Sequence, residues 1–495
     1  MKTRKHAVWL LILCILDCAP RKPANTHELL AIPGAWKATL TAQTDRPDYL
    51  WYYVSVKPDS SLAISLIYEA GPRCRIWALD DDVTVDGSQV AWKDHQGVLS
   101  RTLDTMLVLE EGNGERLAWR FVRERSADSL LAALHGCAGE SYVYRKPETL
   151  NDGWTCGDLS ESGFDTVKLV GLVKEIRSGD HDDIHSLLIA RRGTLVLEEY
   201  FAANGSKHGN CITRIFRDRV HHLASTTKSV TSTLVGIAID QGFIRSVDEP
   251  IYQYLPAYAS VFSEEKKRIR IRDMLTMTPG FAWRQFGVSE AQNDGMQMWH
   301  TDDVIRFVLE KPLVAEPGKQ LNYTNGVPTV TGAIIRSATG MEVKDYAQRN
   351  LFGPLGIPEF LWTSYPDGSI ETDGGLALRP RDLAKIGQLF LDGGVRNGKR
   401  IVSEQWVSES TKERFRFGKG NRWGYGYHWM QADTRIGDSL VHSYFVPGDG
   451  NQILAVFPEL EMVVVFTAGN YGRDPKPEYY SLFTEFILPS VTFKE

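Results

Sequence analysis

The stretch that decides the fold is His221–Gly242, HHLASTTKSVTSTLVGIAIDQG. From Val230 onward it is apolar on nearly every side, which predicts a helix buried between other elements. Ser225 stands at the start of this helix and Lys228 follows three positions later, on the same helix face, so we expect the hydroxyl and the amine to be neighbours. A serine at a helix start is also a common cap. The meaning of the pair therefore depends on the rest of the chain.

A lysine inside such a helix loses the water that stabilises its charged form, which favours the neutral amine. A neutral amine beside a serine hydroxyl is a base beside a nucleophile. The spacing alone is a weak signal, because Ser263 and Lys266 repeat it among charged residues, where we expect a solvated lysine. The apolar helix is what makes Ser225 and Lys228 the candidate catalytic pair.

A second polar group, Tyr323-Thr324-Asn325, precedes another apolar segment. A phenol near a buried lysine could carry a proton between the serine and a leaving group. An asparagine amide could hold a substrate carbonyl or order the lysine. The structural alternative is a core aromatic followed by a turn at Asn325 and Gly326, and the segment taken alone favours that alternative.

Length and composition limit the classes of function. The chain has 495 residues, of which 43% are hydrophobic, enough for two or three domains. Its formal charge is -6 and its pI is near 6.1, so it has no basic excess to neutralise phosphates and nucleic acid is not an expected partner. No Gly-x-Ser-x-Gly, His-Glu-x-x-His or Cys-x-x-Cys motif is present, and we expect neither a metal nor a cofactor.

The N-terminus has the layout of a secretory signal. Basic residues precede a short apolar run, Ala7–Leu16, which is too short to span a bilayer. We expect a signal peptide within residues 1–22, cleavage near Ala19, and a periplasmic or secreted protein. A lipid anchor on Cys18 is the one expected means of membrane attachment, but Asp17 stands where lipidation signals carry a small residue.

The cysteines beyond the signal allow two interpretations. An even number in an exported protein permits two disulfides, with three pairings that the sequence does not separate. The alternative is a set of buried free thiols. The residues concerned are Cys74, Cys137, Cys156 and Cys211.

Two domains are expected from the change in pattern along the chain. Residues 25–150 alternate apolar and polar positions around a hairpin signal at Glu111–Glu115, which predicts a small antiparallel all-β domain. Residues 151–495 have a hairpin early, turning at Arg191 to Gly193, and another late, turning at Pro458 and Glu459, with helical patterns between them. This order predicts an α+β domain whose antiparallel sheet is built from both ends of the segment, with an inserted helical subdomain.

Together the Ser225-Thr-Thr-Lys228 block, Tyr323-Thr-Asn325 and the segment FVPGDG at 445–450 resemble the serine hydrolases of the β-lactamase and penicillin-binding-protein superfamily. Within it, the sequence is most similar to the class C-like branch of 6-aminohexanoate-dimer hydrolase and related esterases. The resemblance extends over residues 150 to 490, through stretches such as LLIARRGTLVLEEYF and GGLALRPRDLAKIGQLFLDGG. The first domain lies outside it.

The resemblance implies a role for each of these positions. Ser225 would be the nucleophile that forms an acyl-enzyme, Lys228 the group that helps deprotonate it, and Tyr323 the proton relay to the leaving group. Asn325 and Gly448 would contact substrate. The oxyanion hole would use the backbone N–H groups of Ser225 and of Asp449, which follows Gly448.

One departure from the family changes the expected substrate. Members that bind β-lactams or D-Ala peptides carry Lys-Thr-Gly or a similar basic triad where this chain has Val446-Pro447-Gly448. Asp449 adds a negative charge there, which disfavours anionic substrates. We expect a hydrolase of small neutral or amine-bearing esters, amides or short peptides, with β-lactams and oligomeric state left open. The alternative is a non-catalytic relative that binds cell-wall peptide or a partner protein.

Two other patterns lack the features of a functional site. GDSL at Gly437–Leu440 matches the nucleophile block of another esterase family, but His442 is the only later histidine and lacks the Asp-x-x-His spacing of that family. His221 and His222 are adjacent and would not share a helix face, so we interpret them as packing or capping residues.

Overall fold

The computed structural model describes residues 142–492 apart from gaps at 182, 202–216, 219, 419, 421 and 472–477, and before them the backbone of strands between Gly34 and Arg123. The chain divides into two compact units, residues 1–138 and 139–495, and each is described by itself. The expected signal peptide and three of the four cysteines, Cys74, Cys137 and Cys211, lie outside the described residues.

The described strands of the first unit form one antiparallel sheet in the order β4-β3-β2-β1-β9-β8-β7-β6-β5. At the Glu111–Glu115 hairpin signal, β8 and β9 pair with Gly112 opposite Glu115. The predicted small antiparallel sheet is confirmed. Its strands are β1 (Gly34–Thr41), β2 (Tyr49–Val56), β3 (Leu62–Glu69), β4 (Ala78–Leu79), β5 (Val83–Asp86), β6 (Gln89–Trp92), β7 (His95–Thr102), β8 (Thr105–Gly112) and β9 (Glu115–Arg123).

The second unit has a sheet in the order β10-β12-β11-β23-β22-β21-β20-β19-β18. The early hairpin, β11 (Ile184–Arg191) and β12 (Thr194–Tyr200), lies beside the late strand β23 (Met462–Ala468), as the sequence predicted. Arg192 and Gly193 have φ values of 51° and 74°, the left-handed backbone that a two-residue type I′ hairpin requires. The short strand β10 (Thr155–Cys156) pairs parallel to β12.

Three strands in the outer half of this sheet were not predicted: β18 (Phe415–Phe417), β19 (Trp423–Tyr425) and β20 (Met430–Ile436). Beside them, β21 (Ser439–Gly448) ends at Gly448, and β22 (Gln452–Phe457) is the first strand of the predicted late hairpin. Ile436 pairs with Ser439 across the β20–β21 hairpin, so the GDSL motif is a turn with an exposed Leu440.

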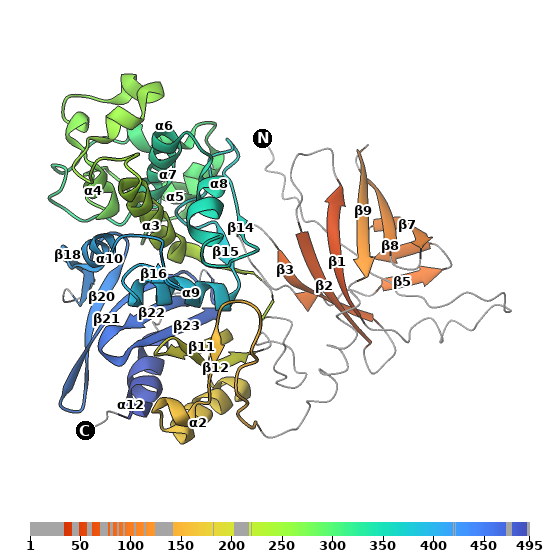
Figure 1. Cartoon of the computed structure of the whole chain (residues 1–495). Coiled ribbons are helices and arrows are strands. Elements are labelled where there is room, and N and C mark those ends of the chain that lie inside the picture. Colours follow the sequence, from red (N-terminus) through yellow and green to blue (C-terminus); the bar gives the residue numbers. More distant parts are fainter. Residues whose placement is uncertain are drawn as a thin grey trace. The chain divides into compact units, whose positions relative to one another are not determined.

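Helix α9 (Pro380–Leu391) covers one face of the sheet, over β11, β22 and β23 (Figure 1). Gly387 permits this close packing, because a Cβ atom there would lie 2.6 Å from Val463 Cγ1. Every residue of β11 is buried. Burial on both faces explains why the middle of this strand, Leu187 to Ala190, is an apolar run that does not alternate with polar residues.

The C-terminal helical segment covers the other face. The ring of Phe483 lies 5.4 Å from that of Phe457 on β22 and 5.9 Å from that of Phe466 on β23. The segment comprises α11 (Glu478–Ser481), η13 (Leu482–Ile487) and α12 (Leu488–Ser490), and it packs on α2 (Thr166–Ser178).

The predicted helical subdomain is inserted between the two ends of the sheet (Figure 1). Its central helix α3 (Thr227–Asp240) packs on α7, and a Cβ atom on Gly236 of α3 would lie 2.3 Å from the Trp406 ring. The α-helices are α4 (Ile271–Leu275), α5 (Asp294–Gln297), α6 (Val304–Glu310), α7 (Gly326–Thr339), α8 (Val343–Ala347) and α10 (Glu404–Thr411). The short strands are β13 (His221–His222), β14 (Leu361–Trp362), β15 (Leu376–Leu378), β16 (Val395–Arg396) and β17 (Lys399–Arg400).

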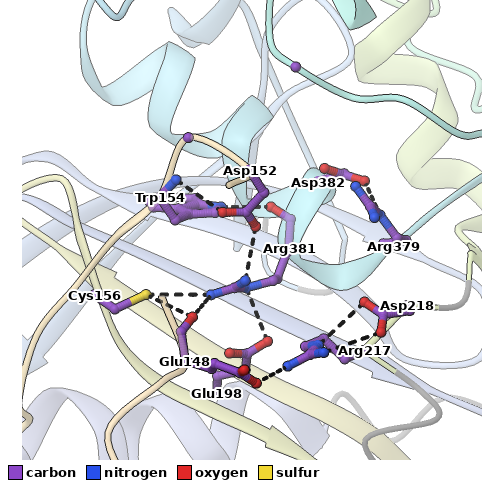
Figure 2. Close-up of polar contacts among 12 residues, drawn as sticks. Glu148, Asp152, Trp154, Cys156, Glu198, Arg217, Asp218, Arg379, Arg381 and Asp382 are labelled. Carbon is purple, nitrogen blue, oxygen red and sulfur yellow. Dashed lines mark hydrogen bonds and ion pairs between the residues drawn. The ribbon is translucent and has the colours of Figure 1, made fainter. Parts of the chain in front are cut away.

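A buried ion-pair network ties the start of the second unit to α9 (Figure 2). The Arg381 guanidinium lies 3.0 Å from the Asp152 carboxylate and 3.1 Å from that of Glu198. It also donates to the carbonyl oxygen of Glu148 at 2.8 Å and to the Cys156 thiol at 3.4 Å. Cys156 is a buried free thiol, so the disulfide interpretation is wrong for this residue. Among the described helices, none has the length and apolar character to cross a bilayer.

Candidate active site

Ser225 lies in a short 3-10 turn, η4 (Ala224–Thr226), directly before α3. Ala224 has a φ of 46°, a left-handed conformation that is uncommon for a residue with a side chain. The Lys228 amine donates to the Ser225 hydroxyl over 2.8 Å and to the Asp373 carbonyl oxygen over 2.6 Å. Lys228 is only 2% exposed. The structure thus brings the candidate nucleophile and base together in a buried setting.

Tyr323 and Asn325 lie in the loop before α7, where the sequence placed them. The Lys228 amine is 5.2 Å from the centre of the Tyr323 ring. The backbone N–H of Asn325 donates to the side chain of Gln285, while its own side-chain oxygen is buried and has no hydrogen-bond partner within the described part of the chain. A buried polar atom without a partner favours binding of an external donor.

Strand β21 passes close to η4, the turn that carries the candidate nucleophile Ser225 and is here named the nucleophile turn. The Thr226 hydroxyl donates to the Val446 carbonyl at 3.3 Å. A Cβ atom on Gly448 would lie 2.2 Å from the carbonyl oxygen of Leu223, so only glycine lets the strand end approach Ser225 this closely. Asp449, the next residue, is exposed. The strand end therefore borders the turn that carries Ser225.

The turn after β21 is fixed by a buried glutamine. The Gln452 amide donates to the carbonyl oxygens of Gly450 at 3.0 Å and Ala468 at 2.6 Å, and accepts from the Ala468 N–H at 3.2 Å. These bonds tie the turn between β21 and β22 to the end of β23. They support the backbone of the segment that the family resemblance assigns to the oxyanion hole.

Several residues near the site were missed by the sequence interpretation because no local motif marks them. Tyr425 and His428 bond to each other, hydroxyl to Nδ1, at 3.1 Å. Burial, with a contribution from Tyr323, raises the pKa of Tyr425. Burial, with a contribution from the charge of Lys228, lowers the pKa of His428 to about 3. Both side chains therefore face the catalytic candidates and stay neutral near pH 7.

An exposed aromatic side chain also borders the site. Phe286 is 70% exposed, and its ring centre lies 5.9 Å from that of Tyr323. An exposed phenylalanine beside a polar reaction centre offers an apolar surface to a bound ligand.

His221 and His222 form strand β13, just before the nucleophile turn. His221 Nε2 lies 2.8 Å from His185 Nδ1. Burial lowers the pKa of His221 to about 3 and that of His222 to about 4, so both rings are neutral near pH 7.

The second Ser-x-x-Lys pair differs from the first. Lys266 is half-buried and its amine donates to the carbonyl oxygen of Leu309, so the expectation of a fully solvated lysine was wrong. Burial lowers the pKa of Lys266. The exposed Ser263 hydroxyl accepts instead from the Lys266 backbone N–H at 3.3 Å. Here the serine hydroxyl bonds a backbone N–H, and no amine in the described part of the chain is bonded to it.

Comparison with known proteins gives the family. Residues 185–481 match the model of the Beta-lactamase family. The 6-aminohexanoate-dimer hydrolase of Paenarthrobacter ureafaciens is 28% identical over 223 residues, 44% of this chain and 54% of that protein. The D-alanyl-D-alanine-carboxypeptidase/endopeptidase AmpH of Escherichia coli K12 is 26% identical over 151 residues, 30% of this chain and 38% of that protein. The chain thus spans about half or less of the length of these two relatives.

Solved structures share the fold. A family VIII carboxylesterase superposes with a TM-score of 0.53 at 14% identity, covering 67% of this chain and 99% of its own. A class C beta-lactamase superposes with a TM-score of 0.52 at 14% identity, over 71% of this chain and 100% of its own. A putative 6-aminohexanoate-dimer hydrolase from Bacillus anthracis superposes with a TM-score of 0.52 at 18% identity, over 70% of this chain and 87% of its own. Because the family model covers more than half of the chain, this protein belongs to the beta-lactamase family, and its second unit has the α+β fold of the class C-like serine hydrolases.

Proposed function

We propose that this protein is an exported serine hydrolase that cleaves an ester or amide bond through an acyl-enzyme on Ser225. The observation that carries the proposal is the 2.8 Å bond between the Lys228 amine and the Ser225 hydroxyl, in a site where Lys228 is buried. A base held against a nucleophile in this way is the arrangement that covalent acyl transfer requires.

The chemistry follows from the proposed roles. Lys228 accepts the Ser225 proton as the serine oxygen attacks the substrate carbonyl, and the backbone N–H groups of Ser225 and Asp449 stabilise the oxyanion. Tyr323 delivers a proton to the departing alcohol or amine. Water then attacks the acyl-enzyme with the same groups acting in reverse, which releases the acid and restores Ser225. Asn325 and Gly448 border the bound substrate.

The substrate class follows from the edge of the site. Val446-Pro447-Gly448 offers no cation to a substrate carboxylate, and Asp449 is exposed next to it. Phe286 presents an apolar surface beside Tyr323. These features favour small neutral or amine-bearing esters, amides or short peptides. The named activities of the relatives, a dimer hydrolase and a carboxypeptidase/endopeptidase, support the same bond types.

Export is proposed from the N-terminal sequence, in which basic residues precede the apolar run Ala7–Leu16. Fractionation of cells that express the full chain, with N-terminal sequencing of the mature protein, tests it. Cleavage near Ala19 supports export, whereas an intact N-terminus on cytoplasmic protein contradicts it.

The function is tested by labelling the purified protein with a fluorophosphonate and mapping the modified residue by mass spectrometry. We expect stoichiometric label on Ser225, none on Ser225→Ala, and full labelling of Ser263→Ala, the matched control in the second Ser-x-x-Lys. Lys228→Met, which keeps the side-chain volume, should reduce labelling and ester turnover by about 10²–10⁴-fold.

The labelling result distinguishes a serine hydrolase from a non-catalytic binding module. If Ser225 is labelled, turnover of esters, amides and β-lactams by the unlabelled protein then defines the substrate. A folded wild-type protein that takes no label, and that binds cell-wall peptide equally well as Ser225→Ala, would instead be a non-catalytic relative.

A further inference from the structure

Two buried carboxyl groups, Glu371 and Asp373, lie next to the proposed base and have no part in the chemistry above. They are 6% and 3% exposed and stand in the segment between β14 and β15. The backbone carbonyl of Asp373 accepts the second bond of the Lys228 amine, at 2.6 Å. The charge of Lys228 acts on both carboxyl groups and opposes the rise in their pKa values. The pair therefore belongs to the environment of Lys228.

The two carboxyl groups have unequal hydrogen bonds. Asp373 Oδ1 accepts from the Tyr365 hydroxyl at 2.6 Å and from the Thr329 hydroxyl at 3.1 Å. Two donors to one oxygen favour the ionised form. The Glu371 side chain accepts from Thr363 alone among the described hydroxyl groups. Two buried carboxyl groups in one site do not both ionise readily, so the proton belongs on Glu371.

We infer that Glu371 and Asp373 form an acid pair that holds one proton at neutral pH and thereby sets the charge of Lys228. The inference rests on the proposed function, in which Lys228 takes the proton of Ser225. The Asp373 carboxylate stabilises the ammonium that forms in that step. The protonated Glu371 keeps the pair at a single negative charge, so that one carboxylate and not two acts on the Lys228 amine. Both acids act through Lys228 and are positioning residues.

Titration of Glu371 gives this arrangement a signature in pH. Burial, with a contribution from the charge of Asp373, raises the pKa of Glu371 to about 8. Burial also raises the pKa of Asp373. As the pH rises through about 8, Glu371 loses its proton, and the second negative charge favours the ammonium form of Lys228. Acylation then slows with rising pH, whereas a lysine base without these neighbours becomes more active.

The other titratable groups around the pair keep their charge in this range. Burial and the two acids raise the pKa of Tyr365 well above its usual value. His222, which faces the backbone of Gly374, has a pKa lowered by burial to about 4, and His428, beside Lys228, has one lowered to about 3. Tyr323 lies over Lys228 and is common to all the variants compared.

The backbone that follows Glu371 packs closely on its carboxyl group. A Cβ atom on Gly375 would lie 2.6 Å from Glu371 Oε2, and one on Gly374 would lie 3.2 Å from Oε1. The glycine pair therefore closes over the carboxyl group and holds it in its buried position.

The test is the rate of fluorophosphonate labelling of Ser225 between pH 6 and pH 10. In the wild type we expect the rate to fall above pH about 8, by up to about tenfold per pH unit. Glu371→Gln keeps the bond from Thr363, remains uncharged, and should lose this decline while labelling at pH 7 within about threefold of the wild-type rate. Glu199→Gln is the matched control. Burial raises the pKa of the Glu199 carboxyl group to about 7, but its hydrogen-bond partner is Tyr142. The dependence of the labelling rate on pH should therefore be the same in Glu199→Gln as in the wild type.

Infrared difference spectra of Glu199→Gln between pH 7 and pH 9 give a second readout that does not need activity. This variant is used because the raised pKa of Glu199 would add the same band in the wild type. We expect the band of a protonated carboxyl group to disappear as the pH rises. An unchanged alkaline decline in Glu371→Gln, a wild-type rate that rises through pH 9, or no such band would overturn the inference alone. A wild type that takes no label at any pH would overturn the proposed function instead.

Discussion

The amine of Lys228 lies 5.2 Å from the centre of the Tyr323 ring, although 95 positions of sequence separate them. Tyr323→Phe removes the phenol oxygen and keeps the ring that contacts Lys228 and Phe286. If the phenol carries the proton to the leaving group, kcat for an ester with a poor leaving group should fall by about 10²–10⁴-fold.

Tyr346→Phe is the matched control for that experiment. Its hydroxyl is bonded to Gln241 over 3.0 Å, outside the candidate site, and its kcat should equal that of the wild type. A leaving group that needs no protonation, such as a nitrophenolate, should narrow the defect of Tyr323→Phe. Equal activity of the two variants on all substrates would show that Tyr323 is a packing residue.

Gly448 is required by the approach of β21 to the nucleophile turn. In Gly448→Ala the new methyl group would meet the Leu223 carbonyl oxygen. We expect a loss of about 1–3 kcal/mol in the free energy of unfolding and a fall of about 10²-fold in kcat/KM, because displacement of the strand misplaces the oxyanion donor.

Gly171→Ala provides the comparison, measured by urea denaturation and ester turnover. Gly171 lies inside helix α2, where a Cβ atom meets nothing within 4 Å. This variant should gain about 0.5–1 kcal/mol in stability and keep its activity. If Gly448→Ala retains wild-type turnover, the strand end is not part of the site.

The ion-pair network around Arg381 is expected to be structural (Figure 2). Arg381→Met leaves the buried carboxylates of Asp152 and Glu198 without their cation, and we expect a loss of about 3–5 kcal/mol in the free energy of unfolding. Activity per folded molecule should be unchanged.

The exposed pair Arg336 and Glu342, with side chains 66% and 54% exposed, supplies the control. Arg336→Met should lose under about 1 kcal/mol. Chemical denaturation of both variants at one pH measures the difference. Similar losses in the two would mean that the buried network is no stronger than a surface ion pair.

Stability in acid should depend on His222. Burial lowers its pKa to about 4, whereas in the unfolded chain it takes up a proton near pH 6.5. The unfolded state therefore binds more protons below pH 6.5, and the stability that the neutral ring allows is lost as the pH falls toward 4. From pH 7 to pH 5 this loss amounts to about 2 kcal/mol.

Urea denaturation of wild type and His222→Gln at pH 7 and pH 5 measures this contribution by difference. The difference is needed because buried acids such as Glu199 and Glu371 shift the wild-type curve in the opposite direction. The wild type should lose about 2 kcal/mol more than the variant. An equal loss in both would show that His222 is protonated in the folded protein.

The sequence by itself determined the elements whose pattern is local. The Arg192-Gly193 hairpin, the apolar helix after Ser225 and the loop at Tyr323 were all predicted, because turn residues and periodicity act over a few positions. The same segments resemble the β-lactamase and penicillin-binding-protein superfamily, and this resemblance predicted the family. The strands β18 to β20 were not predicted, since short strands such as Trp423–Tyr425 have too few residues to show a period.

Only the tertiary structure decided what surrounds Lys228. Glu371, Asp373, Tyr425 and His428 come from segments far along the chain and carry no motif that marks them. Contacts between distant segments depend on how the helical subdomain folds back on the sheet. The sequence pattern of one segment does not indicate which other segment it will contact. The same reason explains why the disulfide interpretation was wrong for Cys156. The even number of cysteines suggested disulfides, but the fold buries Cys156 as a free thiol against Arg381.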